Sequence, residues 1–181
     1  MRETVRVQAG EFVATNRDIS LVTVLGSCVA ACVRDRVSGI GGMNHFMLPR
    51  CRDAGDVASA SARYGVNAME LLINELIHLG ARRSNLEAKV FGGGAVLATV
   101  TSIDVGGMNA EFVSGFLREE GIPVVASDLR GTLSRKVKFD PASGRAFVQG
   151  LGRGSRAAIE EESRYAERLA ALPGGGSIEF F

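Results

Sequence analysis

Two stretches of helical periodicity interrupt a chain that otherwise consists of short apolar runs and turns, and this order is the strongest constraint on the fold. Apolar residues recur at helical spacing over 61–79, and Gly80 follows as a natural C-terminal cap. A second helix is predicted from about Asn109, a suitable N-cap, to near Gly121. This order does not fit a regular alternation of strands and helices. We therefore predict an α/β layered sandwich, in which two long helices pack on a mixed, largely antiparallel sheet.

Strands are predicted where apolar or alternating segments end at turn residues. They cover 4–7, 19–25, 29–33, 40–48, 89–91, 96–100, 122–126, 135–139 and 145–148. The segment 122–126 is expected to be buried, and the last two strands are expected to form a hairpin around a turn at 140–144.

The length of 181 residues fits one domain with a complete hydrophobic core. After Leu151 the composition changes to a glycine-rich and arginine-rich linker, a charge-rich helical segment over 157–172 and a glycine-rich break. We therefore expect a domain over 1–151 and a flexible C-terminal tail with a possible helix over 152–181.

Composition and charge narrow the class of partner and the compartment. The formal net charge of +1, the absence of tryptophan and the presence of only two tyrosines argue against a dedicated nucleic-acid binder. Protein partners are therefore expected. The N-terminal segment lacks an apolar core of signal-peptide length, and no apolar run approaches a membrane span. We expect a cytoplasmic protein without direct membrane insertion, whose three cysteines are reduced.

A cysteine and a histidine flank the most informative turn of the chain. The apolar runs on either side of 35–39 would pair as an antiparallel hairpin centred on Arg36 and Val37. In that register Cys28 and His45 become cross-strand neighbours, with Cβ atoms roughly 4.5–5.5 Å apart. An imidazole at that distance can take the thiol proton and lower the cysteine pKa, so the pair predicts a thiolate nucleophile.

Neighbouring residues supply the other parts of such a site. Gly26 permits a sharp turn just before Cys28, where exposed backbone N–H groups can bind an oxyanion. The nearest hydroxyls that could orient His45 belong to Thr23 and Ser20, although either can equally be a strand-surface residue.

A metal site is the main alternative for these residue types. Cys28, Cys32, His45 and Cys51 could together suggest zinc, but Cys-x3-Cys is not zinc-knuckle spacing, and residues 28 and 32 of a strand are about 13 Å apart. We therefore predict no metal ligand and no cofactor. The glycines at 92–94 are interpreted as a tight turn near the site, because no phosphate-loop lysine follows them.

Two motifs resemble the signature of the chemoreceptor glutamine deamidase family, CheD. They are Leu25-Gly26-Ser27-Cys28-Val29-Ala30 and Gly41-Gly42-Met43-Asn44-His45-Phe46-Met47-Leu48-Pro49. Further segments follow in the order of the family and extend the resemblance to about Gly150, so that 1–151 is expected to be a CheD-like deamidase domain. These are Arg63-Tyr64-Gly65, Lys89 to Ala95, Gly106 with Asn109, Gly121 to Val125 and Arg135-Lys136-Val137.

The resemblance implies a fold related to the deamidase domain of certain bacterial toxins. It implies cysteine-dependent hydrolysis of specific glutamine side chains to glutamate on methyl-accepting chemotaxis receptors, with glutamyl methyl ester hydrolysis in some members. The family nucleophile maps onto Cys28 and the family histidine onto His45. The supporting threonine of the family falls at Val22, and we assign its role to the adjacent Thr23. The implied partners are cytoplasmic receptor helices and, in some bacteria, a CheC-type phosphatase.

Two other functions fit the same residues. The protein could be a non-catalytic adaptor that binds chemoreceptors or a CheC-type phosphatase, or a cysteine hydrolase that acts on a free small amide. For the deamidase, we expect specificity to come from a surface groove around Cys28, where the small residues Ser27 and Ala30 leave room for a receptor helix.

Overall fold

A computed structural model of the protein describes residues 2–49, 57–96, 103–152 and 155–171. The elements are β1 (Thr4–Arg6), β2 (Phe12–Thr15), β3 (Ser20–Leu25), β4 (Val29–Asp35), β5 (Gly41–Asn44), α1 (Val57–His78), the 3-10 turn η1 (Arg83–Asn85), β6 (Leu86–Gly92), α2 (Val105–Glu119), β7 (Val124–Leu129), β8 (Ser134–Asp140), β9 (Arg145–Leu151) and α3 (Arg156–Ala170). No helix in these ranges is both long and apolar enough to cross a membrane.

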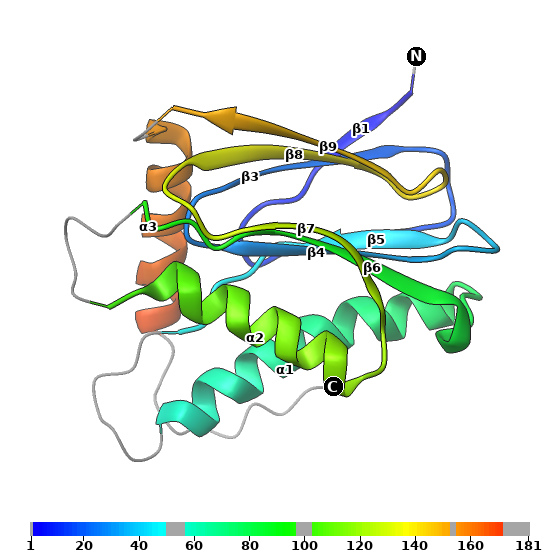
Figure 1. Cartoon of the computed structure of the whole chain (residues 1–181), viewed down its shortest axis with the longest axis horizontal. Coiled ribbons are helices and arrows are strands. Elements are labelled where there is room, and N and C mark those ends of the chain that lie inside the picture. Colours follow the sequence, from blue (N-terminus) through cyan, green and yellow to red (C-terminus); the bar gives the residue numbers. More distant parts are fainter. Residues whose placement is uncertain (1, 50–56, 97–102, 153–154, 172–181) are drawn as a thin grey trace.

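Two stacked β-sheets and a pair of helices form three layers (Figure 1). One sheet has the strand order β1-β3-β8-β9, and the other has the order β2-β5-β4-β6-β7. The pairs β1–β3 and β6–β7 are parallel and the remaining pairs are antiparallel. The predicted α/β class and the mixed, largely antiparallel pairing are therefore confirmed, whereas a relation to toxin deamidases stays a prediction.

Strand β4 separates the two halves of the core, because its side chains alternate between the two faces of the sheet. Val29, Ala31 and Val33 are buried in the cluster formed with α1 and α2. The alternate residues, which include Ala30 and Cys32, are buried in the cluster formed with β3 and β8 of the other sheet. Residues next to β4 can therefore reach the space between the sheets.

Both predicted helices are present, and each begins earlier than expected. Helix α2 starts at Val105, with Asp104 as its N-cap accepting a hydrogen bond of 2.8 Å from the N–H of Gly107. Asn109, predicted as the N-cap, lies inside the helix. A Cβ at Gly106 would lie 2.5 Å from a carbonyl oxygen of the 92–94 turn. Glycine is needed here for close packing.

The predicted hairpin of β8 and β9 is confirmed. Strand β7 is present, but the expected burial of 122–126 is wrong except at Ile122, because β7 is an edge strand and Val125 is 51% exposed. Strand β2 was not predicted. Of the predicted strand 96–100, only Val96 lies within the described residues, and it is in a turn.

The helix expected in the tail is present as α3, but it is packed and not free. It stands at one end of the sandwich, beside the ends of strands from both sheets (Figure 1). Ala158, Glu161, Glu162 and Tyr165 are all buried on the face that it turns toward the sheets. The charge-rich composition suggested a mobile segment, whereas two of its charged side chains are hydrogen-bonded inside the protein. The boundary at residue 151 stays a prediction.

Candidate active site

Cys28 and His45 are near neighbours, although the predicted strand register is wrong. The register of β4 against β5 continues into an isolated bridge between Val29 and Phe46, with hydrogen bonds of 3.0 Å in both directions. Extending it places Met47 opposite Cys28. Cys28 and His45 are therefore diagonal neighbours two positions apart, and residues so related lie on the same face of a sheet.

The turn between β4 and β5 sets this register. It closes on Asp35 and Ile40, whose backbone N–H and carbonyl are 2.8 Å apart. The Asp35 carboxylate accepts hydrogen bonds from the N–H groups of Val37 (2.8 Å) and Ser38 (3.0 Å). Gly39 adopts a φ of 76°, a conformation that favours glycine. The hairpin is consequently centred one residue further along than predicted.

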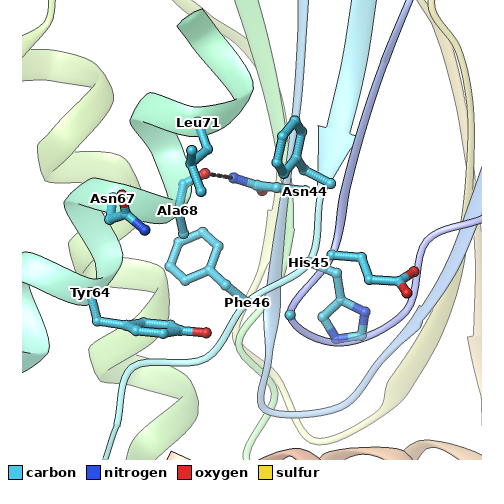
Figure 2. Close-up of a pocket in the computed structure, with 10 residues that line it drawn as sticks. Asn44, His45, Phe46, Tyr64, Asn67, Ala68 and Leu71 are labelled. Atoms are coloured by element: carbon cyan, nitrogen blue, oxygen red, sulfur yellow. Dashed lines mark hydrogen bonds between the residues drawn. The ribbon is translucent and has the colours of Figure 1, made fainter. Parts of the chain in front are cut away.

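The regular pairing of β5 with β4 stops at Asn44, just before His45. Its amide oxygen accepts a hydrogen bond of 2.9 Å from the Ala31 N–H, and its amide nitrogen donates to the Ala68 carbonyl of α1 at 3.1 Å (Figure 2). Figure 2 also shows the His45 and Phe46 side chains on opposite sides of the chain, with Phe46 directed toward α1. His45 is thereby directed into the space between the sheets.

This region also borders a pocket between α1 and the β2 edge of the sheet (Figure 2). It is lined by Gly10, Glu11, Phe12, Asn44, His45, Phe46, Tyr64, Asn67, Ala68 and Leu71. The backbone of His45 is bonded to two other lining residues, since its carbonyl accepts from the Gly10 N–H and its N–H donates to the Glu11 carbonyl.

Thr23 determines which nitrogen of His45 carries a proton. The Thr23 hydroxyl lies 2.7 Å from the Val7 carbonyl oxygen and 2.8 Å from Nδ1 of His45. A carbonyl only accepts, so the hydroxyl hydrogen goes to Val7 and Nδ1–H must donate to the Thr23 oxygen. Nε2 of the neutral ring then carries a lone pair. Within the described part of the chain, Nε2 is buried and has no hydrogen-bond partner.

Three backbone N–H groups next to the cysteine converge on one carboxylate. The N–H groups of Gly26 (2.8 Å), Ser27 (2.9 Å) and Cys28 (2.7 Å) all donate to Glu162, as does the Ser27 hydroxyl at 2.7 Å. Glu162 belongs to α3 and is 1% exposed. Its carboxylate, Sγ of Cys28 and a ring nitrogen of His45 all lie within 4.8 Å of one another. The N–H groups that were expected to be exposed and to bind an oxyanion are therefore occupied by this carboxylate, and their oxyanion role stays a prediction.

Gly26 is required for space and not for its backbone conformation. Its φ is outside the left-handed region, so the expected sharp turn does not explain it. A Cβ at this position would lie 3.0 Å from a carboxylate oxygen of Glu162 and 2.9 Å from the Val96 side chain. Glycine therefore lets the carboxylate approach the backbone.

The 92–94 glycines form the tight turn expected beside the site. Gly92 and Gly93 have φ angles of 106° and 66°. The N–H of Gly93 donates to the Cys28 carbonyl, and the N–H of Gly94 donates to the Gly26 carbonyl, both at 2.8 Å. The turn thus fixes the backbone of the loop 26–28.

Asn109 also holds this loop, and its role was not predicted. It is fully buried on α2; its amide nitrogen donates to the Ser27 carbonyl at 2.8 Å, and its oxygen accepts from the Leu48 N–H at 2.9 Å. The sequence predicted Asn109 as a helix N-cap, and nothing in the sequence pattern indicated that its side chain connects Ser27 and Leu48.

The electrostatics favour an uncharged pair in this arrangement. Burial raises the pKa of the Cys28 thiol well above its ordinary value, and the charge of Glu162 and a hydrogen bond to it raise that pKa further. Burial lowers the pKa of His45, while the carboxylates of Glu161 and Glu162 act in the opposite direction. The site at rest therefore holds a thiol and a neutral imidazole.

The expected open groove around Cys28 is absent from the described structure. Cys28, Ser27 and Ala30 are all buried, with at most 1% exposure. The small side chains of Ser27 and Ala30 leave no free space, because α3 lies over the loop and inserts Glu162. This segment was expected to be mobile, and its packing explains the difference.

The remaining candidate residues lie elsewhere or take other roles. Ser20 is bonded to Asp140 at 2.6 Å and takes no part in the site. Cys51 lies outside the described residues. In the described ranges, the donors close enough to hold a metal ion are Cys28, His45 and Glu162, without Cys32. Both carboxylate oxygens of Glu162 already accept two hydrogen bonds each from the loop, so this donor is committed to the protein.

Glu162 is the main site residue that the sequence analysis missed. It stands in a run of three glutamates, which is typical of an exposed helix face. A weak signal exists, since Ala158, Tyr165 and Leu169 recur at helical spacing and share a face with Glu162.

A family model and the relatives found by sequence comparison all point to the same family. A family model described as CheD chemotactic sensory transduction matches residues 47–150. The chain is 53% identical over 182 residues to the probable chemoreceptor glutamine deamidase CheD of Methylobacillus flagellatus, covering 99% of this chain and 90% of that protein. It is 54% identical over 181 residues to the probable chemoreceptor glutamine deamidase CheD 1 of Dechloromonas aromatica, covering 99% and 89%.

Among solved structures, the Bacillus licheniformis hypothetical protein YfiH matches with a TM-score of 0.39 and 14% sequence identity, over 67% of this chain and 49% of that one. This likeness is too remote to inform either the fold or the chemistry.

Proposed function

The chain belongs to the CheD family, and from this premise we propose that it is a chemoreceptor glutamine deamidase whose nucleophile is Cys28. In this proposal His45 is the general base and Thr23 orients it. Two observations carry the proposal: a ring nitrogen of His45 lies within 4.8 Å of Sγ of Cys28, and Nε2 of that ring is buried without a partner in the described residues while Nδ1 is held by Thr23.

The first half of the reaction forms a thioester. Sγ of Cys28 gives its proton to Nε2 of His45 and attacks the carboxamide carbon of the receptor glutamine. The resulting oxyanion is stabilised by backbone N–H groups of the Gly26–Cys28 loop. When the intermediate collapses, the C–N bond breaks and ammonia leaves with the proton returned by His45.

The second half restores the thiol. A water molecule gives a proton to the same Nε2 and attacks the thioester carbon, and the C–S bond breaks. Glutamate is released, and the sulfur recovers its proton. The sum is one glutamine side chain plus water giving glutamate plus ammonia, without a cofactor.

Several finer expectations remain predictions within this proposal. Hydrolysis of glutamyl methyl esters needs the same acyl transfer, with methanol leaving in place of ammonia. Recognition of cytoplasmic receptor helices, regulation by a CheC-type phosphatase and a cytoplasmic location also follow from the family resemblance.

A mass measurement on the receptor tests the proposal. A purified chemoreceptor cytoplasmic fragment incubated with the enzyme should gain about 1 Da for each converted glutamine, with ammonia released. Cys28→Ala and His45→Ala should abolish the gain. Cys32→Ala is the matched control, because Cys32 is buried in the same layer but lies outside the cluster, and it should keep the activity.

The alternatives give different results in the same assay. An adaptor would form a complex with the receptor without any mass change. An enzyme for free small amides would release ammonia from free glutamine while leaving the receptor unmodified. A Cys28→Ala variant that still converts receptor glutamines would refute the assignment of the nucleophile.

A further inference from the structure

Helix α3 is fixed over the active site by polar contacts from one of its faces. Glu161 accepts from the Ala9 N–H at 3.0 Å and pairs with Arg6 at 2.7 Å. The hydroxyl of Tyr165 is hydrogen-bonded to that of Tyr64 on α1. These contacts lie on both sides of Glu162 along the helix and hold its carboxylate against the N–H groups of the loop 26–28. The position of the carboxylate is therefore fixed by the packing of α3.

The chemistry of Glu162 matches the product of the proposed reaction. Deamidation of glutamine yields a glutamate side chain, and here a glutamate side chain lies within 4.8 Å of Sγ of Cys28. One of its oxygens accepts from the N–H groups of Gly26 and Cys28, where the mechanism needs donors for the substrate oxygen. A buried carboxylate that receives several N–H donors is well stabilised in its charged form.

The second oxygen of Glu162 distinguishes product from substrate. It accepts from both the N–H and the hydroxyl of Ser27, at 2.9 and 2.7 Å. An amide NH2 at that position would face the Ser27 N–H, donor against donor. The loop therefore holds the carboxylate form more tightly than the carboxamide form, while a carboxamide oxygen can still accept from the Gly26 and Cys28 N–H groups.

We propose that α3 is an intramolecular occupant of the substrate site, in which Glu162 takes the place of the reacting receptor side chain. A receptor segment then reaches Cys28 only after α3 has moved away, so the resting chain is autoinhibited. This inference rests on the proposed function. It explains why Cys28 and His45 are fully buried in an enzyme whose substrate is another protein.

Release of α3 is physically feasible because the helix depends on these contacts. It has 15 residues, and isolated helices of this length are marginal in water. Three of its buried residues are the polar Glu161, Glu162 and Tyr165, so much of its attachment can be exchanged for contacts with water or with a receptor.

Alkylation of Cys28 in the full-length chain tests the occupancy. With iodoacetamide under native conditions, Glu162→Ala should react at Cys28 at least about tenfold faster than the wild type, because α3 is no longer locked. Its receptor deamidation rate should rise as well. Glu160→Ala is the matched control, since Glu160 is exposed on the same helix, and it should behave as the wild type. Equal Cys28 reactivity in Glu162→Ala and wild type would overturn the proposal.

Peptide mapping separates release of α3 from general unfolding. Cys32 is buried within β4 in the inter-sheet core and lies outside the group formed by Cys28, His45 and Glu162, so it should stay unreactive when only the helix leaves. If Glu162→Ala exposes both cysteines, the alkylation is repeated with Tyr165→Phe as the test variant. Tyr165→Phe loses the hydroxyl hydrogen bond with Tyr64 and leaves Glu162 intact. Faster alkylation of Cys28 alone in Tyr165→Phe supports the proposal, and an unchanged rate contradicts it.

Self-conversion of Glu162→Gln gives an independent test. With glutamine at this position, Sγ of Cys28 attacks the side-chain carbon, the C–N bond breaks, ammonia leaves with the proton from His45, and water hydrolyses the thioester. The chain should gain about 1 Da at residue 162 over time, and should not do so when Cys28→Ala is also present. A Glu162→Gln chain that keeps its glutamine while converting the receptor contradicts the proposal and leaves the deamidase function intact.

Failure of the proposed function has a different signature. In that case no variant modifies the receptor, although Glu162→Ala still exposes Cys28 to alkylation. The occupancy of the site by α3 would then stand, whereas the identification of Glu162 with a reaction product would fall.

Discussion

A neutral residue, Thr23, occupies the position that many nucleophile–histidine sites give to a carboxylate. A carboxylate beside the imidazole raises the pKa of that ring, whereas a hydroxyl accepts the Nδ1 proton without adding charge. His45 can therefore stay neutral between turnovers, and Nε2 remains available for the thiol proton. Nδ1–H of His45 donates to the Thr23 hydroxyl, and that hydroxyl donates to the Val7 carbonyl.

Thr23→Val should consequently lower the turnover number for receptor deamidation. The variant keeps the shape of the side chain but leaves the buried Nδ1–H without its acceptor, at a cost of about 1–3 kcal/mol, which corresponds to roughly a 5- to 150-fold loss. Thr23→Ser should retain most of the activity, since it keeps the hydroxyl. The pH dependence of kcat/KM should also shift in Thr23→Val. Equal activity of both variants would show that the hydroxyl does not orient His45.

The residues of the site differ in how far the sequence could predict them. Cys28 and His45 were found although the register was wrong by two positions, because diagonal neighbours still share one face of a sheet. Thr23 was one of two hydroxyl candidates, and only the structure distinguishes it from Ser20. Glu162 could not be predicted, because its importance comes from where α3 docks, and a run of glutamates carries no information about that.

At the scale of secondary structure elements, the turn between β4 and β5 positions the histidine. The Asp35 carboxylate accepts hydrogen bonds from the N–H groups of Val37 and Ser38 in the turn. It also accepts one of 2.8 Å from the N–H of Arg82, which follows α1 in the chain. Burial by itself raises the pKa of Asp35, but these backbone hydrogen bonds, with one from the Asn85 side chain, lower it to about 2.

Acid should therefore weaken this hairpin through one identifiable group. The folded-state pKa of Asp35 is depressed, so its contribution to the free energy of unfolding is present above its ordinary value of 3.8 and is lost as the pH falls toward about 2. The shift corresponds to about 2 kcal/mol. In urea titrations, the stability difference between wild type and Asp35→Asn should shrink over this pH interval. A difference that stays constant with pH would contradict the assignment.

Periodicity predicted the long elements well and the short ones poorly. Helix α1 and the β8–β9 hairpin show clear patterns that extend over many residues. Strand β2 has four residues and no strict alternation, so its place at the sheet edge is decided by pairing with β5. Gly106 at the start of α2 is explained by its contact with the 92–94 turn, which lies outside the helix.

At the scale of the whole molecule, the proposed catalytic groups come from both sheets of the sandwich and from the loop between them. Thr23 comes from the four-stranded sheet, Cys28 from the loop that crosses to the five-stranded sheet, and His45 from the end of β5. Helix α3 closes the end of this arrangement (Figure 1). Access to the sulfur and attachment of the C-terminal helix are therefore coupled, since Glu162 and a substrate cannot occupy the same N–H groups.

Covalent modification of Cys28 should release α3 for the same reason. Sγ is fully buried beside the Glu162 carboxylate, so a carbamidomethyl group on the sulfur has no space unless the helix moves. Amide hydrogen exchange over 156–170 should accelerate strongly in the alkylated chain, whereas exchange in the buried part of α1 around Leu72 should not change. Cys28→Ala treated with the same reagent is the control and should keep the protection of α3. If the helix stays protected after Cys28 itself is modified, the end of the sandwich can accommodate a ligand beside α3, and substrate need not displace it.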